Sequence, residues 1–293
     1  MNLIKNENKI AFLIIMSVLV LVSLLWFAFE NPNLNPRLEK ENYTIIRKWE
    51  MPKELDEISG ITWLGENRIA CVQDEEGIIF IYNLASSAVE KKVTFSKSGD
   101  YEGITVVDST AFVLRSDGEL YEIVNFLNNN FEVKIHKTPF SGKNNMECLT
   151  FDKENNRLLL MPKDKDLEST EFIGMYAFNL ETKQLDSHPV LSVNHSDFII
   201  KSKSKDDDGS VSNTIHPADI AINPLDGNYY IVEGKKPKLL IVDSTGKTLK
   251  LHNLVKDTFN QPEGIIFSPD GTMYISNEGK NGTANIMEVE LEK

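Results

Sequence analysis

The sequence predicts an all-β protein, a β-propeller of four-stranded blades that follows a single N-terminal membrane helix. Three observations lead to this prediction. A short motif occurs five times, each copy is followed by further short apolar strands, and one uncharged apolar stretch lies near the N-terminus. About 250 of the 293 residues lie beyond that stretch, which suits one large all-β domain better than two ordinary ones.

The repeated motif opens an alternating strand in each copy. The five copies occupy residues 57–61, 100–104, 145–149, 216–220 and 261–265, so their starts are 43, 45, 71 and 45 residues apart. A turn rich in Gly, Pro, Asn or Asp and two more apolar strands follow in each unit, and most units add a fourth strand. Four short strands in about 45 residues are typical of a propeller blade.

The last unit ends at Lys293 after its third strand, and residues 43–50 form a strand without a unit of its own. We expect residues 43–50 to pair with residues 285–289 and close the ring, because an unpaired edge would be a liability. Five blades are favoured. Six are the alternative if residues 186–215 hide a degenerate blade, although residues 201–210 contain no apolar side chain and predict a surface loop.

The N-terminal apolar stretch covers residues 11–29, close to the roughly 20 residues that a spanning helix needs. It is longer than the core of a signal peptide and is followed by no small-residue cleavage motif. We therefore expect an uncleaved signal anchor, with a cleaved signal peptide as the alternative. Residues 1–10 would be a cytoplasmic tail, 30–42 a polar linker and 43–293 the propeller on the outer side of the membrane.

Composition and motifs narrow the function. A formal charge of −13 argues against nucleic acid but is compatible with cationic ligands or metal ions. Cys71 and Cys148 lie in apolar strands and are expected to be buried free thiols, with a disulfide as the alternative. No GxSxG, HExxH, Walker or GxGxxG motif is present, so the sequence leaves open whether the protein is an enzyme.

Polar residues gather where a propeller would bring its loops together. In a four-stranded meander, the first strand begins and the second ends on the same face. The ligand-binding candidates at these positions are Glu57, Asp74, Glu75, Asp100, Lys163, His216, Gln261 and Glu278. Glu102, Glu147 and Glu263 share one repeat position and are the candidate metal ligands, for Ca²⁺ or Mg²⁺. The alternative is that these glutamates accept hydrogen bonds between blades.

The motifs resemble those of the SdiA-regulated (YjiK-like) family of envelope β-propeller proteins over residues 43–293. The resemblance rests on residues 57–62, 72–75 with Gly77, 99–104, 146–149, 216–217 and 261–265. The chain departs from the family pattern at Ala218-Asp219 and at residues 276–279. The resemblance implies a bacterial cell membrane, with the propeller on the periplasmic or extracellular side, and it implies no chemistry.

These observations favour a non-enzymatic binding module that is anchored to the membrane by its N-terminal helix. Its expected partner is a small molecule or another envelope protein, with a divalent cation at the channel mouth. The alternative is a metal-dependent hydrolase of phosphoesters or glycans that uses the acidic loop face.

Overall fold

The computed structural model describes residue 16 and residues 42–195, 214–280 and 282–292. Residues from Asn42 onwards form one compact unit. Apart from Met16 and Asn42, the expected tail, membrane anchor and linker lie outside the described residues, as does the expected loop at 201–210. The part of the chain that the structure describes contains no helix long and apolar enough to cross a membrane.

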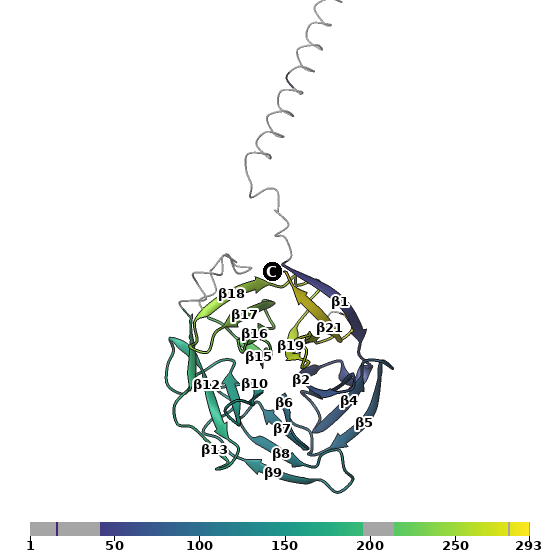
Figure 1. Ribbon diagram of the computed structural model, residues 1–293, viewed down its shortest axis with the longest axis vertical. Coiled ribbons are helices and arrows are strands. Elements are labelled where there is room, and N and C mark those ends of the chain that lie inside the picture. Colours follow the sequence, from purple (N-terminus) through teal and green to yellow (C-terminus); the bar gives the residue numbers. More distant parts are fainter. Residues whose placement is uncertain (1–15, 17–41, 196–213, 281, 293) are drawn as a thin grey trace, which may run out of the picture. The chain divides into compact units, whose positions relative to one another are not determined.

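The described chain forms five blades around a common axis (Figure 1). The first blade contains β2 (Ile58–Gly65), β3 (Arg68–Gln73), β4 (Ile78–Asn83) and β5 (Ala88–Thr94), after the short 3₁₀ helix η1 (Lys53–Leu55). The second contains β6 (Tyr101–Val107), β7 (Thr110–Arg115), β8 (Leu120–Val124) and β9 (Glu132–His136). The fourth contains β15 (Pro217–Ile222), β16 (Tyr229–Glu233), β17 (Lys238–Val242) and β18 (Thr248–Asn253). Each is an antiparallel meander whose first strand lies nearest the axis.

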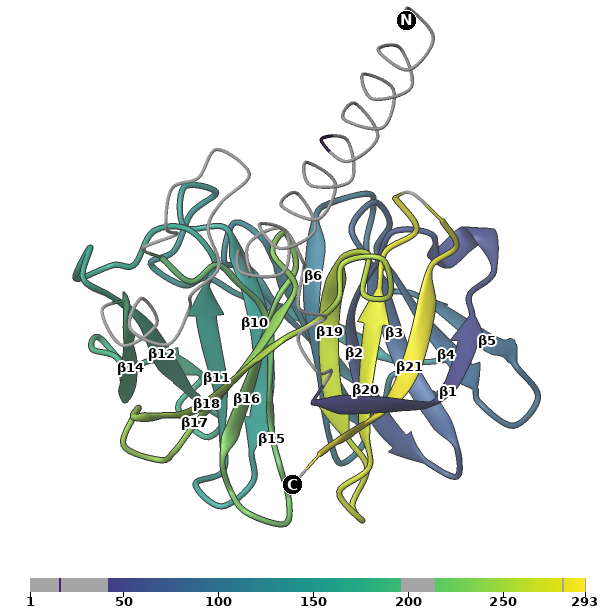
Figure 2. The ribbon, with the colours of Figure 1, turned by 90° about the horizontal axis from the view of Figure 1, so that it is seen from above.

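The fifth blade combines the two ends of the propeller, as the sequence predicts. It contains β19 (Pro262–Phe267), β20 (Met273–Asn277), β21 (Asn285–Leu291) and, on its outer edge, β1 (Tyr43–Glu50). β1 runs antiparallel to β21, from the pair Tyr43 and Leu291 to the pair Glu50 and Asn285. Figure 2 shows the two strands side by side. The predicted closure of the ring is confirmed.

The third blade has an interrupted outer strand. It contains β10 (Met146–Asp152), β11 (Arg157–Pro162), β12 (Phe172–Asn179), β13 (Gln184–Leu185) and β14 (Leu191–Asn194). β13 and β14 both pair with β12, and Pro189 lies between them. Proline cannot donate to a ladder, which explains the break. The described part of 186–215 therefore completes the third blade, and the six-blade alternative is wrong.

Five apolar clusters lie between neighbouring blades, each with residues from two blades. Successive side chains of a strand point to opposite faces, so each blade buries one set against each neighbour. Cys71 and Cys148 are buried and free, which confirms the expected thiols and excludes the disulfide. Burial raises the pKa of both thiols, so they stay protonated and unreactive.

Candidate functional site

A β-bulge occurs at the same place in the inner strand of every blade. In β6 the pairing with the second strand passes from Tyr101 directly to Gly103 and leaves out Glu102. The inner strands β10, β15 and β19 leave out one residue in the same way. In β2 the irregularity lies between Ile58 and Ile61. Bulges turn a side chain out of the regular alternation and are frequent beside functional sites. The shared position of Glu102, Glu147 and Glu263 therefore corresponds to a shared bulge.

The residue after the bulge sets how closely neighbouring inner strands approach. A Cβ atom at Gly60 would lie 2.5 Å from the carbonyl oxygen of Glu102, and one at Gly103 would lie 2.9 Å from that of Glu147. Only glycine fits such an approach to backbone. In the fourth blade Asp219 takes this place, and its Oδ2 accepts a hydrogen bond of 2.9 Å from the Ile265 amide of the fifth blade. The bulge residues are thus carried by a tightly packed ring of inner strands.

Lys163 contacts two of the three glutamates at this level. Its Nζ lies 3.1 Å from Glu147 Oε1 and 3.8 Å from Glu263 Oε2. These glutamates belong to the third and fifth blades, and the fourth blade between them carries Ala218 at the bulge. Gly234 also lies close, since a Cβ there would be 2.9 Å from Glu263 Oε1. Lys163 is thus the internal counter-ion of Glu147 and Glu263, and the fourth blade between these glutamates carries the small residues Ala218 and Gly234.

The candidate residues lie at or near the starts of the inner strands and the ends of the second strands, and they become more buried toward the bulges. We call this set of residues the carboxylate funnel. Glu57, Glu75 and Asp100 are exposed at its rim; Asp74, Glu102, Lys163, His216 and Gln261 are half-buried; Glu147, Glu263 and Glu278 are buried. The structure thus brings together residues from all five blades. Eight of these eleven residues are carboxylates. Seven of them, all except Glu75, are linked by charge interactions that raise the pKa values of Asp74, Glu102, Glu147 and Glu263, while Lys163 lowers the pKa values of the three glutamates.

Glu102 is the glutamate without a partner. Its half-buried carboxylate makes no hydrogen bond or ion pair with any residue that the structure describes. Burial and the charge of Glu147 raise the pKa of Glu102 well above its usual value. Burial also raises the pKa of Glu147 to about 8, although Lys163 acts in the opposite direction. The group of glutamates holds more negative charge than one ammonium neutralises, so it retains a proton near neutral pH.

A second group of carboxyls lies between the loops of the first, second and fifth blades. Burial and the neighbouring charge of Glu57 raise the pKa of Asp74 to about 7, with smaller contributions from Glu278 and Asp100. Glu278 is paired with Lys280 at 3.2 Å. Gln261 donates a hydrogen bond to Glu263 Oε1, which fixes one oxygen of that glutamate.

His216 and Glu75 make contacts with residues other than the glutamates. His216 Nδ1 is 3.4 Å from Asp164 Oδ1, and its Nε2 is 3.0 Å from Thr214 Oγ1, so the ring joins the loops of the third and fourth blades. The backbone amide of Glu75 donates to Gln73 Oε1, which shapes the loop after β3.

The described residues contain no group of three or more His, Cys, Asp or Glu side chains arranged to hold a metal ion. The ammonium of Lys163 lies against Glu147 and Glu263, two of the three expected ligands. Binding of Ca²⁺ or Mg²⁺ by Glu102, Glu147 and Glu263 stays a prediction.

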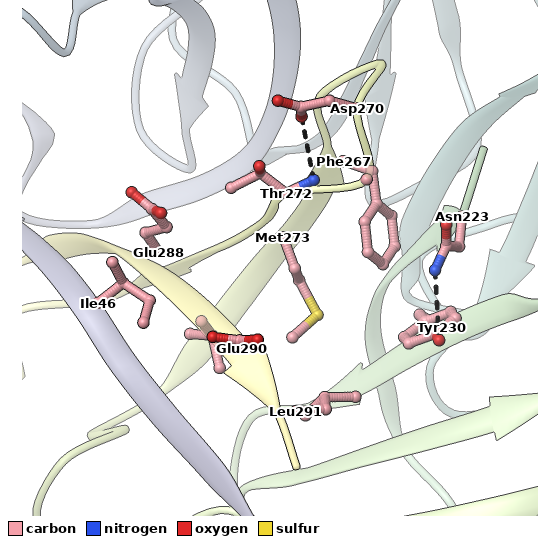
Figure 3. Close-up of a pocket in the computed structure, with 12 residues that line it drawn as sticks. Ile46, Asn223, Tyr230, Phe267, Asp270, Thr272, Met273, Glu288, Glu290 and Leu291 are labelled. Carbon is pink, nitrogen blue, oxygen red and sulfur yellow. Dashed lines mark hydrogen bonds between the residues drawn. The ribbon is translucent and has the colours of Figure 1, made fainter. Parts of the chain in front are cut away.

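The opposite end of the axis has a cavity of about 370 Å³ with a mixed lining. Its apolar residues near the ends of the inner strands include Trp63, Val106, Phe151, Ile222 and Phe267, and its polar residues include Thr105 and Lys153. A further groove of about 320 Å³ lies between the fourth and fifth blades, where Met273 and Phe267 meet Asp270, Glu288 and Glu290 (Figure 3). No sequence pattern predicts either hollow, because their residues belong to ordinary strand ends and turns.

Comparisons with known proteins agree with this architecture. The model of the SdiA-regulated family matches residues 37–282. No curated protein matches the chain at a significant level. Among solved structures, glutaminyl cyclase of Myxococcus xanthus is similar with a TM-score of 0.59 at 13% identity, over 85% of this chain and 96% of that one. The PQQ-bound aldose sugar dehydrogenase of Streptomyces coelicolor gives a TM-score of 0.51 at 11% identity, over 85% and 98%.

Identities this low show a shared fold and nothing of a shared activity. The family match, by contrast, covers most of the chain and includes all five repeats. The chain belongs to the SdiA-regulated family.

Proposed function

We propose that this protein is a membrane-anchored, extracytoplasmic propeller that binds a positively charged ligand in the carboxylate funnel. The observation that carries the proposal is Glu102, a half-buried carboxylate that makes no hydrogen bond or ion pair with a described residue. A partly desolvated charge of this kind destabilises the fold unless a proton, a cation or hydrogen-bond donors compensate it. A ligand that brings positive charge would replace the retained proton and remove this cost.

Two kinds of ligand match the donor set. Carboxylate oxygens suit Ca²⁺ or Mg²⁺, which would use Glu102, Glu147 and Glu263. They equally suit an organic cation, such as the side chain of a protein partner in the envelope or a small amine. The excess of carboxylates over cations in the funnel disfavours anionic ligands.

Substitution of Glu102 tests the binding site. Glu102→Gln removes the charge but keeps the shape, and we expect cation binding to weaken about ten-fold or more, which corresponds to about 1.4 kcal/mol. The measurement is isothermal titration of the full-length protein in detergent, with thermal unfolding as a second readout, because a bound ligand stabilises the fold by mass action. Glu154→Gln is the matched control, since Glu154 is an exposed glutamate in the turn at the other end of the third blade. Equal affinity in Glu102→Gln and in the parent would place the ligand elsewhere.

The anchor is the second part of the proposal. Residues 11–29 are long and apolar enough to span a bilayer as a helix, in which all backbone groups bond internally. We expect protein extracted from membranes to begin at or near Met1. N-terminal sequencing decides this, and a start beyond residue 29 would show that the segment is cleaved.

A further inference from the structure

We infer that the carboxylate funnel selects the primary ammonium group of an organic ligand over a divalent metal ion, and that Lys163 determines this selectivity. The inference rests on the proposed function and names the class of ligand. It concerns the bulge positions of the five inner strands and the lysine that reaches them from the loop after β11.

The five bulge positions are not equivalent. The first blade has Ser59 and the fourth has Ala218, while Glu102, Glu147 and Glu263 occupy the other three. Lys163 contacts the glutamates of the third and fifth blades, which flank the fourth, at 3.1 and 3.8 Å. The protein therefore already binds one ammonium group between two of these carboxylates, and this ammonium belongs to its own chain.

The loop that carries Lys163 is held in place by its backbone. The Lys163 amide donates to Asn145 O at 2.8 Å, and the Asp164 amide donates to Asn144 O at 3.1 Å. The side chain of Asn144 in turn donates to Lys165 O at 2.8 Å. These bonds join the loop to the start of β10, and only 13% of the Lys163 side chain is exposed. The ammonium is a fixed part of the site, because moving it would leave two buried carboxylates without a cation.

A fixed ammonium opposes a divalent ion in two ways. It occupies oxygen atoms of Glu147 and Glu263 that a metal ion would need as ligands, and Ca²⁺ needs about 6 to 8 oxygen ligands. It also places a positive charge a few ångströms from where the ion would lie, which repels a double charge twice as strongly as a single one.

Glu102 is the bulge glutamate that makes no ion pair with Lys163. Burial and the charges of Glu147, Asp100 and Glu263 raise the pKa of its carboxyl, and the more distant charge of Lys163 lowers it. A primary ammonium carries one charge and three N–H donors, so it can bond Glu102 and a neighbouring carboxylate at once. A ligand ammonium at Glu102 would repeat the arrangement that Lys163 makes with Glu147 and Glu263.

Titration with three probes at constant ionic strength tests the selectivity. The probes are 1,5-diaminopentane, its neutral analogue 1,5-pentanediol, and CaCl₂, each added to the full-length protein in detergent. We expect the diamine to bind and raise the melting temperature, and neither the diol nor Ca²⁺ to do so. Binding of Ca²⁺ without binding of the diamine would overturn this inference but keep the proposed function, whereas binding of neither cation would overturn both.

Variants of Lys163 test its role. In Lys163→Met, Glu147 and Glu263 lose their ammonium, and we expect Ca²⁺ to bind at least about ten-fold more tightly than to the parent. Lys163→Arg keeps a cation between the glutamates and should keep the preference of the parent. A folded Lys163→Met that gains no response to Ca²⁺ would overturn the assigned role. If Lys163→Met does not fold, Lys163→Arg carries the test, because Ca²⁺ binding by that variant would contradict it.

Discussion

Removal of residues 43–50 is expected to abolish cooperative unfolding of the propeller. β1 supplies the outer strand of the fifth blade, and without it β21 would expose an unpaired edge that invites aggregation. The measurement is circular dichroism or calorimetry during heating, together with light scattering. We expect the sharp transition of the parent to be replaced by a broad one or by aggregation.

The size of this effect follows from what β1 buries. Tyr43 packs edge-on against Phe259 at 5.3 Å, and its hydroxyl accepts a hydrogen bond of 3.2 Å from the Val255 amide. Trp49 is buried, and its indole nitrogen donates to Leu84 O at 2.8 Å in the first blade. Each aromatic contributes about 2 to 3 kcal/mol by burial alone, against a net stability of about 5 to 15 kcal/mol for a typical domain.

A relocated strand gives the control for this deletion. When residues 43–50 are removed from the N-terminus and joined after Lys293 through a short turn, the same residues can pair again with β21. We expect this variant to recover the sharp transition. Cooperative melting of the simple deletion, at the temperature of the parent, would show that β1 does not close the ring.

Stability is expected to fall as the pH rises from about 5 to 8, and Glu147 is expected to be responsible for much of the slope. Burial raises the pKa of Glu147 to about 8 from an ordinary value of 4.5. A carboxyl with a raised folded-state pKa stabilises the fold fully below its unfolded pKa, and this contribution is lost as the pH rises through the folded value. The expected loss is about 2 kcal/mol, because the neighbouring glutamates and Lys163 share the titration.

Chemical denaturation at a series of pH values measures this slope. In Glu147→Gln the group cannot ionise, so the free energy of unfolding should change less between pH 5 and 8 than in the parent. Glu154→Gln, which alters an exposed glutamate, should leave the slope unchanged. A parent whose stability is constant or rises over this range would show that the funnel is fully ionised and compensated.

The repeat made most of the fold predictable, because the same pattern of turns and strands occurs five times in the sequence. It also predicted that Glu102, Glu147 and Glu263 share one level, since blades related by rotation carry equivalent residues to equivalent places. The break at Pro189 was not predicted, because either side of a proline can still pair with the same neighbour. The membrane anchor is a prediction that the described residues leave untested.

The role of Lys163 as counter-ion to Glu147 and Glu263 could not be predicted from the repeat. It lies in a loop whose length and direction depend on the backbone bonds to Asn144 and Asn145. The available signal was a departure from the pattern, namely Ala218 where three other units have glutamate. The missing glutamate at Ala218 points to Lys163 only once the order of the blades in the ring is known, because that order brings the loop of Lys163 next to the fourth blade. Asp219 also departs from the repeat. It stands where the first and second blades have Gly60 and Gly103, and its side chain accepts a hydrogen bond from the Ile265 amide of the next blade.

The pairing of β1 with β21 has a mechanical consequence. The first residue pair of this ladder, Tyr43 with Leu291, lies at the end where the chain enters the propeller, and Glu292 there donates to Asn42 O at 2.9 Å. Tension applied to the chain before residue 42 therefore separates the β1–β21 pairs one after another, beginning with Tyr43 and Leu291, instead of loading all the hydrogen bonds of the ladder together. Tension from the N-terminal side would detach β1 first, so this strand is the point at which force could open the ring.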